Sequence, residues 1–319
     1  MSSEEIRFSK ALKSIARDQE IKAYLQNSEE LYPFLIKGAD RFVAGETRRE
    51  GMSRVISLYN KGYQVSLEFI GENTTSKKEC MIAKNEFIEL IKDLGNNQLA
   101  ATVSLDLSHI GMMISEKIAF ANLEELANEA QKRNIQLMIS MEESQKTDTI
   151  LSLYKRISKI FSNVGITLQV HLKRSYNDLN DLLKTTGRIR LVKGAYQEPE
   201  GIYIPRSEEL NTRYSEFVSK CIDSNHPLSI ATHDESLLMD LKAKGFLYSP
   251  NVEVEMLDGV QSDLLKSLKE DNIQAKVYVT YGSEWYLYLV HRIAEYPPNI
   301  YTFISDIIEQ NNDREKNAY

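Results

Sequence analysis

The sequence has little cysteine and no long apolar run, and both absences narrow the class of protein. Its 319 residues contain two cysteines, Cys80 and Cys221. Two cysteines cannot build a disulfide framework, so we expect a reducing compartment. The first ten residues carry charges where a signal peptide needs an apolar core, and no run of apolar residues is long enough to span a membrane. We therefore expect a cytoplasmic protein with no transmembrane segment, and leave peripheral association with a membrane open.

Positive charge is also scarce. Lys and Arg total 39 against 46 Asp and Glu, which gives a formal net charge of -7 and a pI near 5.5. No long run of Lys or Arg interrupts this acidic composition. Proteins that bind nucleic acid through its phosphates usually present a basic patch. We therefore expect no nucleic-acid partner, and expect a small molecule as the ligand.

Eight short segments are rich in Val, Ile and Tyr and are too short to be helices. They alternate with stretches that place apolar residues at helical spacing and charges on the opposite face. Eight strand–helix units in succession are typical of a closed (β/α)8 barrel, an α/β fold of the TIM type. The predicted strands are 63–70, 99–107, 135–141, 166–172, 188–195, 227–232, 252–257 and 275–281.

The length and the 42% hydrophobic content suit one such barrel and not two full domains. We predict an N-terminal helical arm over residues 1–50, the barrel over residues 51–308, and a polar C-terminal tail over residues 309–319.

Residues 190–196 are the most informative segment. Leu191 and Val192 form the apolar body of a predicted strand, whereas Arg190 and Lys193 add positive charge and Gly194 permits close approach to an anionic ligand. An arginine within a buried strand is costly unless it has a partner.

In a barrel, catalytic and ligand-binding residues lie at the C-terminal ends of the strands. Polar residues at nearly every strand end predict a large polar ligand; they are Glu68, Glu72, Asp106, His109, Ser140, Glu142, Gln169, His171, Arg190, Lys193, Thr232, His233, Glu255 and Tyr278.

Six separated motifs resemble those of the proline dehydrogenase family. They occur in the family's order over roughly residues 41–300, and several motifs in order are far more specific than one alone. The resemblance implies a distorted (β/α)8 barrel that binds FAD non-covalently, and an enzyme that transfers a hydride to flavin N5 from the carbon next to an amine nitrogen. The motifs are RFVAGET (41–47), IGE (70–72), RLVKGAY (190–196) followed by Glu198, ATHD (231–234), EMLDG (255–259) and YVTYGSEWYLYLVHRIAE (278–295).

The resemblance also assigns a flavin site. Arg190 matches the arginine that hydrogen-bonds near flavin N5, and Gln169 matches the glutamine that faces the edge of the isoalloxazine. The residues that match positions holding the pyrophosphate, ribose and adenine side of FAD are Lys193, Gly194, Thr232 and His233.

The substrate end of the predicted site departs from the family pattern. Asp106 stands where the family has a lysine beside the substrate carboxylate, Ser140 stands where it has an aspartate, and His291 replaces the first of two adjacent arginines. Together these replacements make the pocket about two charges more negative. We therefore predict that the substrate is an imino acid or related amine other than free L-proline, such as an esterified, decarboxylated, carrier-tethered or additionally cationic one.

The remaining residues of the predicted site match the family. Tyr278 and Tyr288 match aromatic residues that wall the imino ring, and Glu72 with His291 is expected to form a pH-sensitive closure contact. The predicted catalytic residues are Arg190, Asp106, Tyr278, Tyr288, His291 and Arg292. The other predicted residues of the substrate pocket are Glu72, Ser140, Leu257, Glu295 and Tyr196.

Several alternatives remain open from the sequence. The chain can be an ordinary L-proline dehydrogenase that forms pyrroline-5-carboxylate, or a catalytically degenerate flavin-binding relative. A metal-dependent barrel hydrolase would use Asp106, His109, Glu142 and His233 as ligands. The charge of Asp106 can be neutralised by pairing with His109, His291 or a lysine. We expect quinone or oxygen as the electron acceptor.

Overall fold

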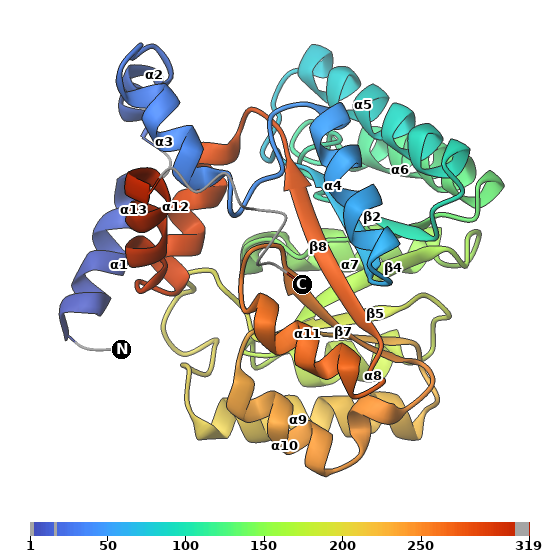
Figure 1. Ribbon diagram of the computed structural model, residues 1–319. Helices are drawn as coiled ribbons and strands as arrows, with labels where there is room; N and C mark the ends of the chain where they lie inside the picture. The colour runs from blue at the N-terminus through green and yellow to red at the C-terminus, as the bar shows by residue number, and fades with distance from the viewer. Residues whose placement is uncertain (1–2, 16–17, 310–318) are drawn as a thin grey trace.

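The computed structural model describes residues 3–15, 18–309 and 319 and contains a closed barrel of eight parallel strands (Figure 1). The strands pair in chain order, and β1 closes the barrel against β8. They are β1 (Gln64–Phe69), β2 (Ala101–Leu105), β3 (Gln136–Ile139), β4 (Val164–Gln169), β5 (Ile189–Val192), β6 (Leu228–Ala231), β7 (Val252–Leu257) and β8 (Ala275–Tyr281). All eight predicted strands are present, so the predicted (β/α)8 fold is confirmed.

Helices outside the barrel connect successive strands. Ser76, Ser115 and Ser207 each accept a backbone N–H with the side chain and so start three of them. The connecting elements are α5 (Lys77–Asn96), α6 (Glu116–Lys132), η1 (Ser144–Lys146), α7 (Thr147–Ile157), α8 (Ser175–Leu182), α9 (Glu208–Asp223), α10 (Glu235–Ala243), η2 (Phe246–Tyr248) and α11 (Ser262–Glu270).

The strands place apolar side chains toward the helices and polar side chains inside the barrel. On β7, Val252 and Val254 belong to the main hydrophobic core, while Glu253 and Glu255 alternate with them and bond across the interior. The same period of two places Leu191 in the core but Val192 against the interior cavity. Val192 is thus an apolar residue of β5, as expected, but it faces the cavity, because only alternate residues of the strand face the helices.

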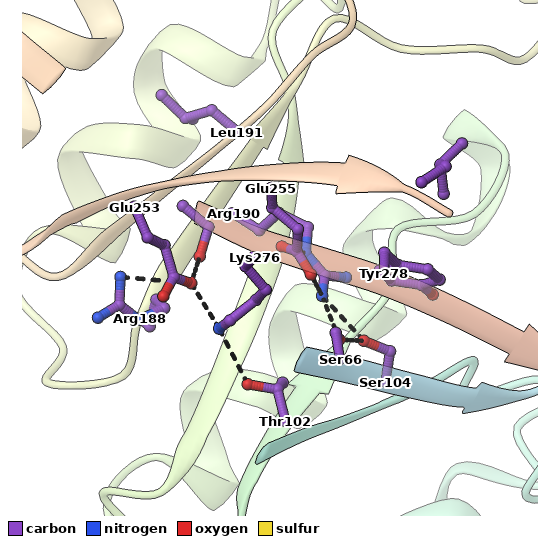
Figure 2. A network of polar contacts seen from close by, with 12 residues as sticks. Ser66, Thr102, Ser104, Arg188, Arg190, Leu191, Glu253, Glu255, Lys276 and Tyr278 are labelled. Carbon is purple, nitrogen blue, oxygen red and sulfur yellow. Dashed lines mark hydrogen bonds and ion pairs between the residues drawn. The ribbon is translucent and has the colours of Figure 1, made fainter. Parts of the chain in front are cut away.

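A buried ion-pair layer fills the N-terminal half of the barrel (Figure 2). Lys276 Nζ lies 2.6 Å from Glu253 Oε1 and 3.1 Å from Thr102 Oγ1. Ser229 donates to the same Glu253 oxygen at 2.5 Å, and Arg188 lies 3.6 Å from it. Each buried charge thus has an opposite charge and hydrogen-bond partners, which burial in a low dielectric requires.

A second hydrophobic cluster lies beside the barrel and includes Trp285 and Phe303. Figure 1 shows its helices grouped at one edge of the barrel, and the Arg41–Asp306 ion pair at 2.5 Å adds a polar contact to the group. These helices are α1 (Ser3–Ile15), α2 (Gln19–Gln26), α3 (Leu31–Ala39), α12 (Trp285–Glu295) and α13 (Asn299–Glu309). None of the helices in the described ranges is both long and apolar enough to cross a bilayer.

The helix α4 (Arg48–Asn60) links this group to the barrel. Thr47 and Glu50 form a capping box at its start, and the helix packs on β1 and β8. The domain limits at residues 50 and 308 stay predictions. Residues 310–318, most of the predicted tail, lie outside the described part of the chain, while the Tyr319 ring packs edge-on against Tyr63 with 5.1 Å between centroids.

Candidate active site

A cavity of about 1440 Å³ lies at the C-terminal ends of the strands. It exceeds the roughly 300–1,000 Å³ of common small-molecule sites, which agrees with the predicted large ligand. The predicted site residues that line it are Ser140, Gln169, Arg190, Lys193, Gly194, Tyr196, Thr232, His233, Leu257, Tyr278, His291 and Arg292. Glu72, Asp106 and Tyr288 are not among its lining residues, and the side chain of Glu295 lies outside the described part of the structure.

Arg190 is buried below this cavity and has a carboxylate partner within the protein (Figure 2). Its Nε donates to Glu255 Oε2 at 2.7 Å, and its Nη2 donates to Glu255 Oε1 at 2.9 Å and to Ser104 Oγ at 2.8 Å. The guanidinium carbon also lies 4.9 Å from the centre of the Tyr278 ring. The partner that a buried arginine requires is thus Glu255, two strands away in the barrel.

Lys193 is likewise paired inside the protein. Its Nζ donates to Asp234 at 2.5 Å and to Asn211 at 2.6 Å. From the sequence, Arg190 and Lys193 were expected to offer their charges to a ligand, and the structure instead pairs both with carboxylates of the protein. Glu255 begins the motif EMLDG and Asp234 ends the motif ATHD. Only the barrel geometry shows that Glu255 pairs with Arg190 and Asp234 with Lys193.

Gly194 has a backbone conformation and surroundings that exclude other residues. Its φ of +109° lies in the region that favours glycine, and a Cβ there would lie 1.4 Å from His171 Nδ1. That nitrogen is 2.7 Å from the Lys193 carbonyl oxygen. The ring of His171 therefore supports the turn that follows β5, and the backbone at Gly194 borders the cavity without a side chain.

Three polar groups beside the cavity lack a partner among the described residues. Gln169 Oε1, Thr167 Oγ1 and His233 Nδ1 are buried and make no hydrogen bond there. Nε2 of His233 accepts the Leu257 N–H at 3.4 Å, and burial lowers the pKa of His233 to about 3, so the neutral ring carries its proton on Nδ1. Buried polar groups are nearly always hydrogen-bonded, and a polar ligand in the cavity would satisfy these three.

Four carboxylates, Glu68, Glu72, Asp106 and Glu142, form an acidic cluster beside the cavity. Burial raises the pKa of Asp106 well above its ordinary value, and the nearby charges of Glu142, Glu68 and Glu72 raise it further. Within the described ranges the Asp106 carboxyl makes no ion pair or hydrogen bond. A direct contact with His109, His291 or a lysine is thus not seen among the described residues, but the charge of Lys146 acts on Asp106 and lowers its pKa.

The neighbours of the acidic cluster are also defined. Lys146 Nζ lies 2.6 Å from Glu142 Oε2, and Ser108 N–H donates to Glu142 Oε1 at 3.0 Å. The Tyr278 hydroxyl donates to Glu68, which joins the cluster to the cavity wall. Glu142 was expected at the end of the third strand, whereas Lys146, in the short helix η1 that follows, was not predicted as a site residue because no motif marks it.

The helix α12 contributes His291 and Arg292 to the cavity. The Arg292 guanidinium lies 5.1 Å from the centre of the Tyr288 ring, so Tyr288 contacts this arginine from the same helix face. Glu72 accepts a hydrogen bond from Asn73 Nδ2 at 3.0 Å. The closure contact between Glu72 and His291 stays a prediction.

The residues proposed for a metal site do not form one. Among the described residues, no group of three or more His, Cys, Asp or Glu side chains has an arrangement that could hold a metal ion. His109 instead stacks on Phe69 with 5.2 Å between centroids, and burial lowers its pKa to about 4. The metal-hydrolase alternative thus has no geometric support.

The raised pKa of Asp106 predicts a specific dependence of stability on pH. The folded protein holds the Asp106 proton above the unfolded pKa of about 3.9. The folded state therefore binds more protons than the unfolded state in this window, and stability falls as pH rises from about 4 through the folded pKa. Asp106→Asn should remove part of this fall, measured as the urea midpoint at several pH values. An unchanged pH dependence in Asp106→Asn would contradict the assigned pKa shift.

Comparisons with known proteins give the family. The family described as proline dehydrogenase matches residues 52–299. The chain is 28% identical over 276 residues to proline dehydrogenase 1 of Bacillus subtilis, covering 86% of this chain and 91% of the relative. It is 30% identical over 271 residues to proline dehydrogenase of Deinococcus radiodurans, covering 82% and 87%.

A solved structure agrees with the observed fold. Proline utilization A from Bdellovibrio bacteriovorus, inactivated by N-propargylglycine, superposes with a TM-score of 0.74 at 20% identity. The match covers 90% of this chain but only 36% of that much longer one. With the family matched over most of the barrel, the chain belongs to the proline dehydrogenase family and is an oxidoreductase that acts on a CH–NH group.

Proposed function

We propose that the protein binds FAD in the cavity and oxidises the C–N bond of an amine or imino acid. The observation that supports a bound cofactor is the set of three buried polar groups on the wall of a cavity of about 1440 Å³, none of which has a hydrogen-bond partner in the part of the chain that the structure describes. When bound, the flavin accepts the hydride at N5. Gln169 and His233 would supply hydrogen bonds, and Gly194 would let the cofactor approach the backbone. The other residues proposed to hold FAD are Arg190, Lys193 and Thr232.

The acidic cluster supports an amine without a free carboxylate as the substrate. Tyr278 and Leu257 line the cavity and offer flat and apolar surfaces for a ring. Asp106 lies among carboxylates that already raise its pKa, so a second carboxylate nearby would be repelled and a cation would be attracted. An esterified, decarboxylated, carrier-tethered or additionally cationic substrate fits these charges.

Ordinary L-proline dehydrogenase activity, which forms pyrroline-5-carboxylate, is the second candidate. The names of relatives that are 28% and 30% identical over more than 80% of this chain favour it. His291 and Arg292 line the cavity and provide basic side chains that could meet a carboxylate. Quinone or oxygen as the acceptor, in a cytoplasmic or membrane-peripheral enzyme, completes either proposal.

The decisive experiment combines visible absorbance with anaerobic reduction. The purified protein is expected to show the absorbance of oxidised flavin, and this absorbance should bleach at least about tenfold faster with L-proline methyl ester or pyrrolidine than with L-proline. Efficient bleaching by free L-proline would support the second candidate. Bound flavin that no amine reduces would support a catalytically degenerate relative, and colourless protein that does not take up added FAD would contradict both candidates.

A further inference from the structure

Two carboxylates on β7 lie at different depths of the barrel and pair with different cations (Figure 2). Glu253 pairs with Lys276 in the deeper layer at 2.6 Å. Glu255, two residues later, pairs with Arg190 at 2.7 Å and borders the cavity. Both carboxylates are almost fully buried, so each interaction is little screened by solvent.

Glu255 determines which part of the Arg190 guanidinium remains for a ligand. It engages both Nε and Nη2 in a two-bond contact, and Ser104 and Ser66 complete the contacts of Nη2 at 2.8 and 3.3 Å. No described residue forms a hydrogen bond with Nη1, and Arg190 lines the cavity. A two-bond contact of this kind fixes the plane of the guanidinium as well as its position.

We infer that Glu255 is a positioning residue: it orients Nη1 of Arg190 toward the cofactor and compensates the charge of Arg190, which lowers the reduction potential of the bound flavin. This inference rests on the proposed FAD site. Reduced flavin carries a negative charge near neutral pH, so an uncompensated arginine below it would stabilise the reduced form more than the oxidised form. Glu255 opposes that effect because its negative charge lies 2.7 Å from the guanidinium.

Glu255→Gln tests the charge effect with nearly unchanged shape, and Glu253→Gln is the matched control. Glutamine keeps an oxygen acceptor for Arg190 but removes the negative charge. The midpoint potential of the bound flavin should therefore rise by about 30 mV or more. For a two-electron reduction, this shift is a tenfold change in the ratio of the protein's affinities for reduced and oxidised flavin. Glu253→Gln removes an equally buried charge from the same strand without touching Arg190. It should shift the potential by much less, measured by the same dye-equilibration titration.

Glu255→Asp tests the orienting effect and remains informative if Glu255→Gln does not fold. Aspartate keeps the charge but is one methylene shorter, so it cannot keep both bonds at their present lengths. We expect at least a several-fold faster dissociation of oxidised flavin with a potential near that of the wild type. Unchanged potential in Glu255→Gln, an equal shift in Glu253→Gln, or unchanged dissociation in Glu255→Asp would overturn the inference. Absence of flavin from the wild type would instead contradict the proposed function.

Discussion

Replacing Asp106 with lysine is expected to raise kcat/KM for L-proline by roughly 100- to 1,000-fold. The attraction between a lysine ammonium and a substrate carboxylate about 4 Å apart is about 4 kcal/mol at an effective dielectric near 20. This energy corresponds to the upper end of the range, about 1,000-fold. The new cation would lie among Glu68, Glu72 and Glu142, whose charges already act on position 106. Opposite charges on three sides should let the folded protein tolerate the substitution.

Asp106→Asn is the matched control for this prediction. It removes the ionisable carboxyl without adding a cation, so its gain in kcat/KM for L-proline should stay below about tenfold. Steady-state assays with L-proline and with pyrrolidine separate the two effects, because pyrrolidine has no carboxylate for the lysine to attract. If Asp106→Lys binds flavin but gains no activity with L-proline, position 106 does not contact the substrate carboxylate.

Replacing Arg190 with methionine is expected to destabilise the protein by about 3–5 kcal/mol, because it leaves Glu255 as an uncompensated buried charge. The double variant Arg190→Met/Glu255→Leu removes both charges and should recover most of that loss. Urea unfolding of flavin-free protein, compared through the midpoint and the slope, measures both effects. A change at Arg190 alone therefore cannot be interpreted as an effect on flavin binding only.

Lys184→Met is the control for the role of burial. Lys184 Nζ lies 2.9 Å from Asp181 Oδ1, and the two side chains are 74% and 47% exposed. Exposed ion pairs contribute about 0–1 kcal/mol, so this variant should lose no more than about 1 kcal/mol. Equal losses for Lys184→Met and Arg190→Met would show that burial does not control the cost of breaking these pairs.

Strand positions were predictable from sequence because each strand carries its own signal. Val, Ile and Tyr concentrate in segments bounded by polar turns, and eight such segments in alternation with helices have one common closed arrangement. The ends of two strands, β4 and β5, differed by three residues. For β5 the prediction extended to residue 195, but the strand ends at Val192. The positive φ of Gly194 breaks the extended conformation there, and the ring of His171 fixes the turn.

The candidate site was predictable where a motif marks a strand end. Lys193, Gly194, Thr232 and His233 came from such motifs, and all four line the cavity. The carboxylate partners of the cations were not predictable, because Glu255 is 65 positions from Arg190 in the sequence. Contacts over such distances depend on the register between neighbouring strands and on which strand face points inward.

The sequence by itself determined the barrel, the family and the excess of acidic residues near the expected substrate site, since these depend on local composition, periodicity and motif order. Only the tertiary structure decided which charged side chains lie next to one another at the site. Closing the barrel brings Glu255 to Arg190, and it gathers Glu68, Glu72 and Glu142 around Asp106. The first contact cancels a positive charge at the cavity, and the second raises the pKa of Asp106. Burial strengthens both effects because little water remains to screen them.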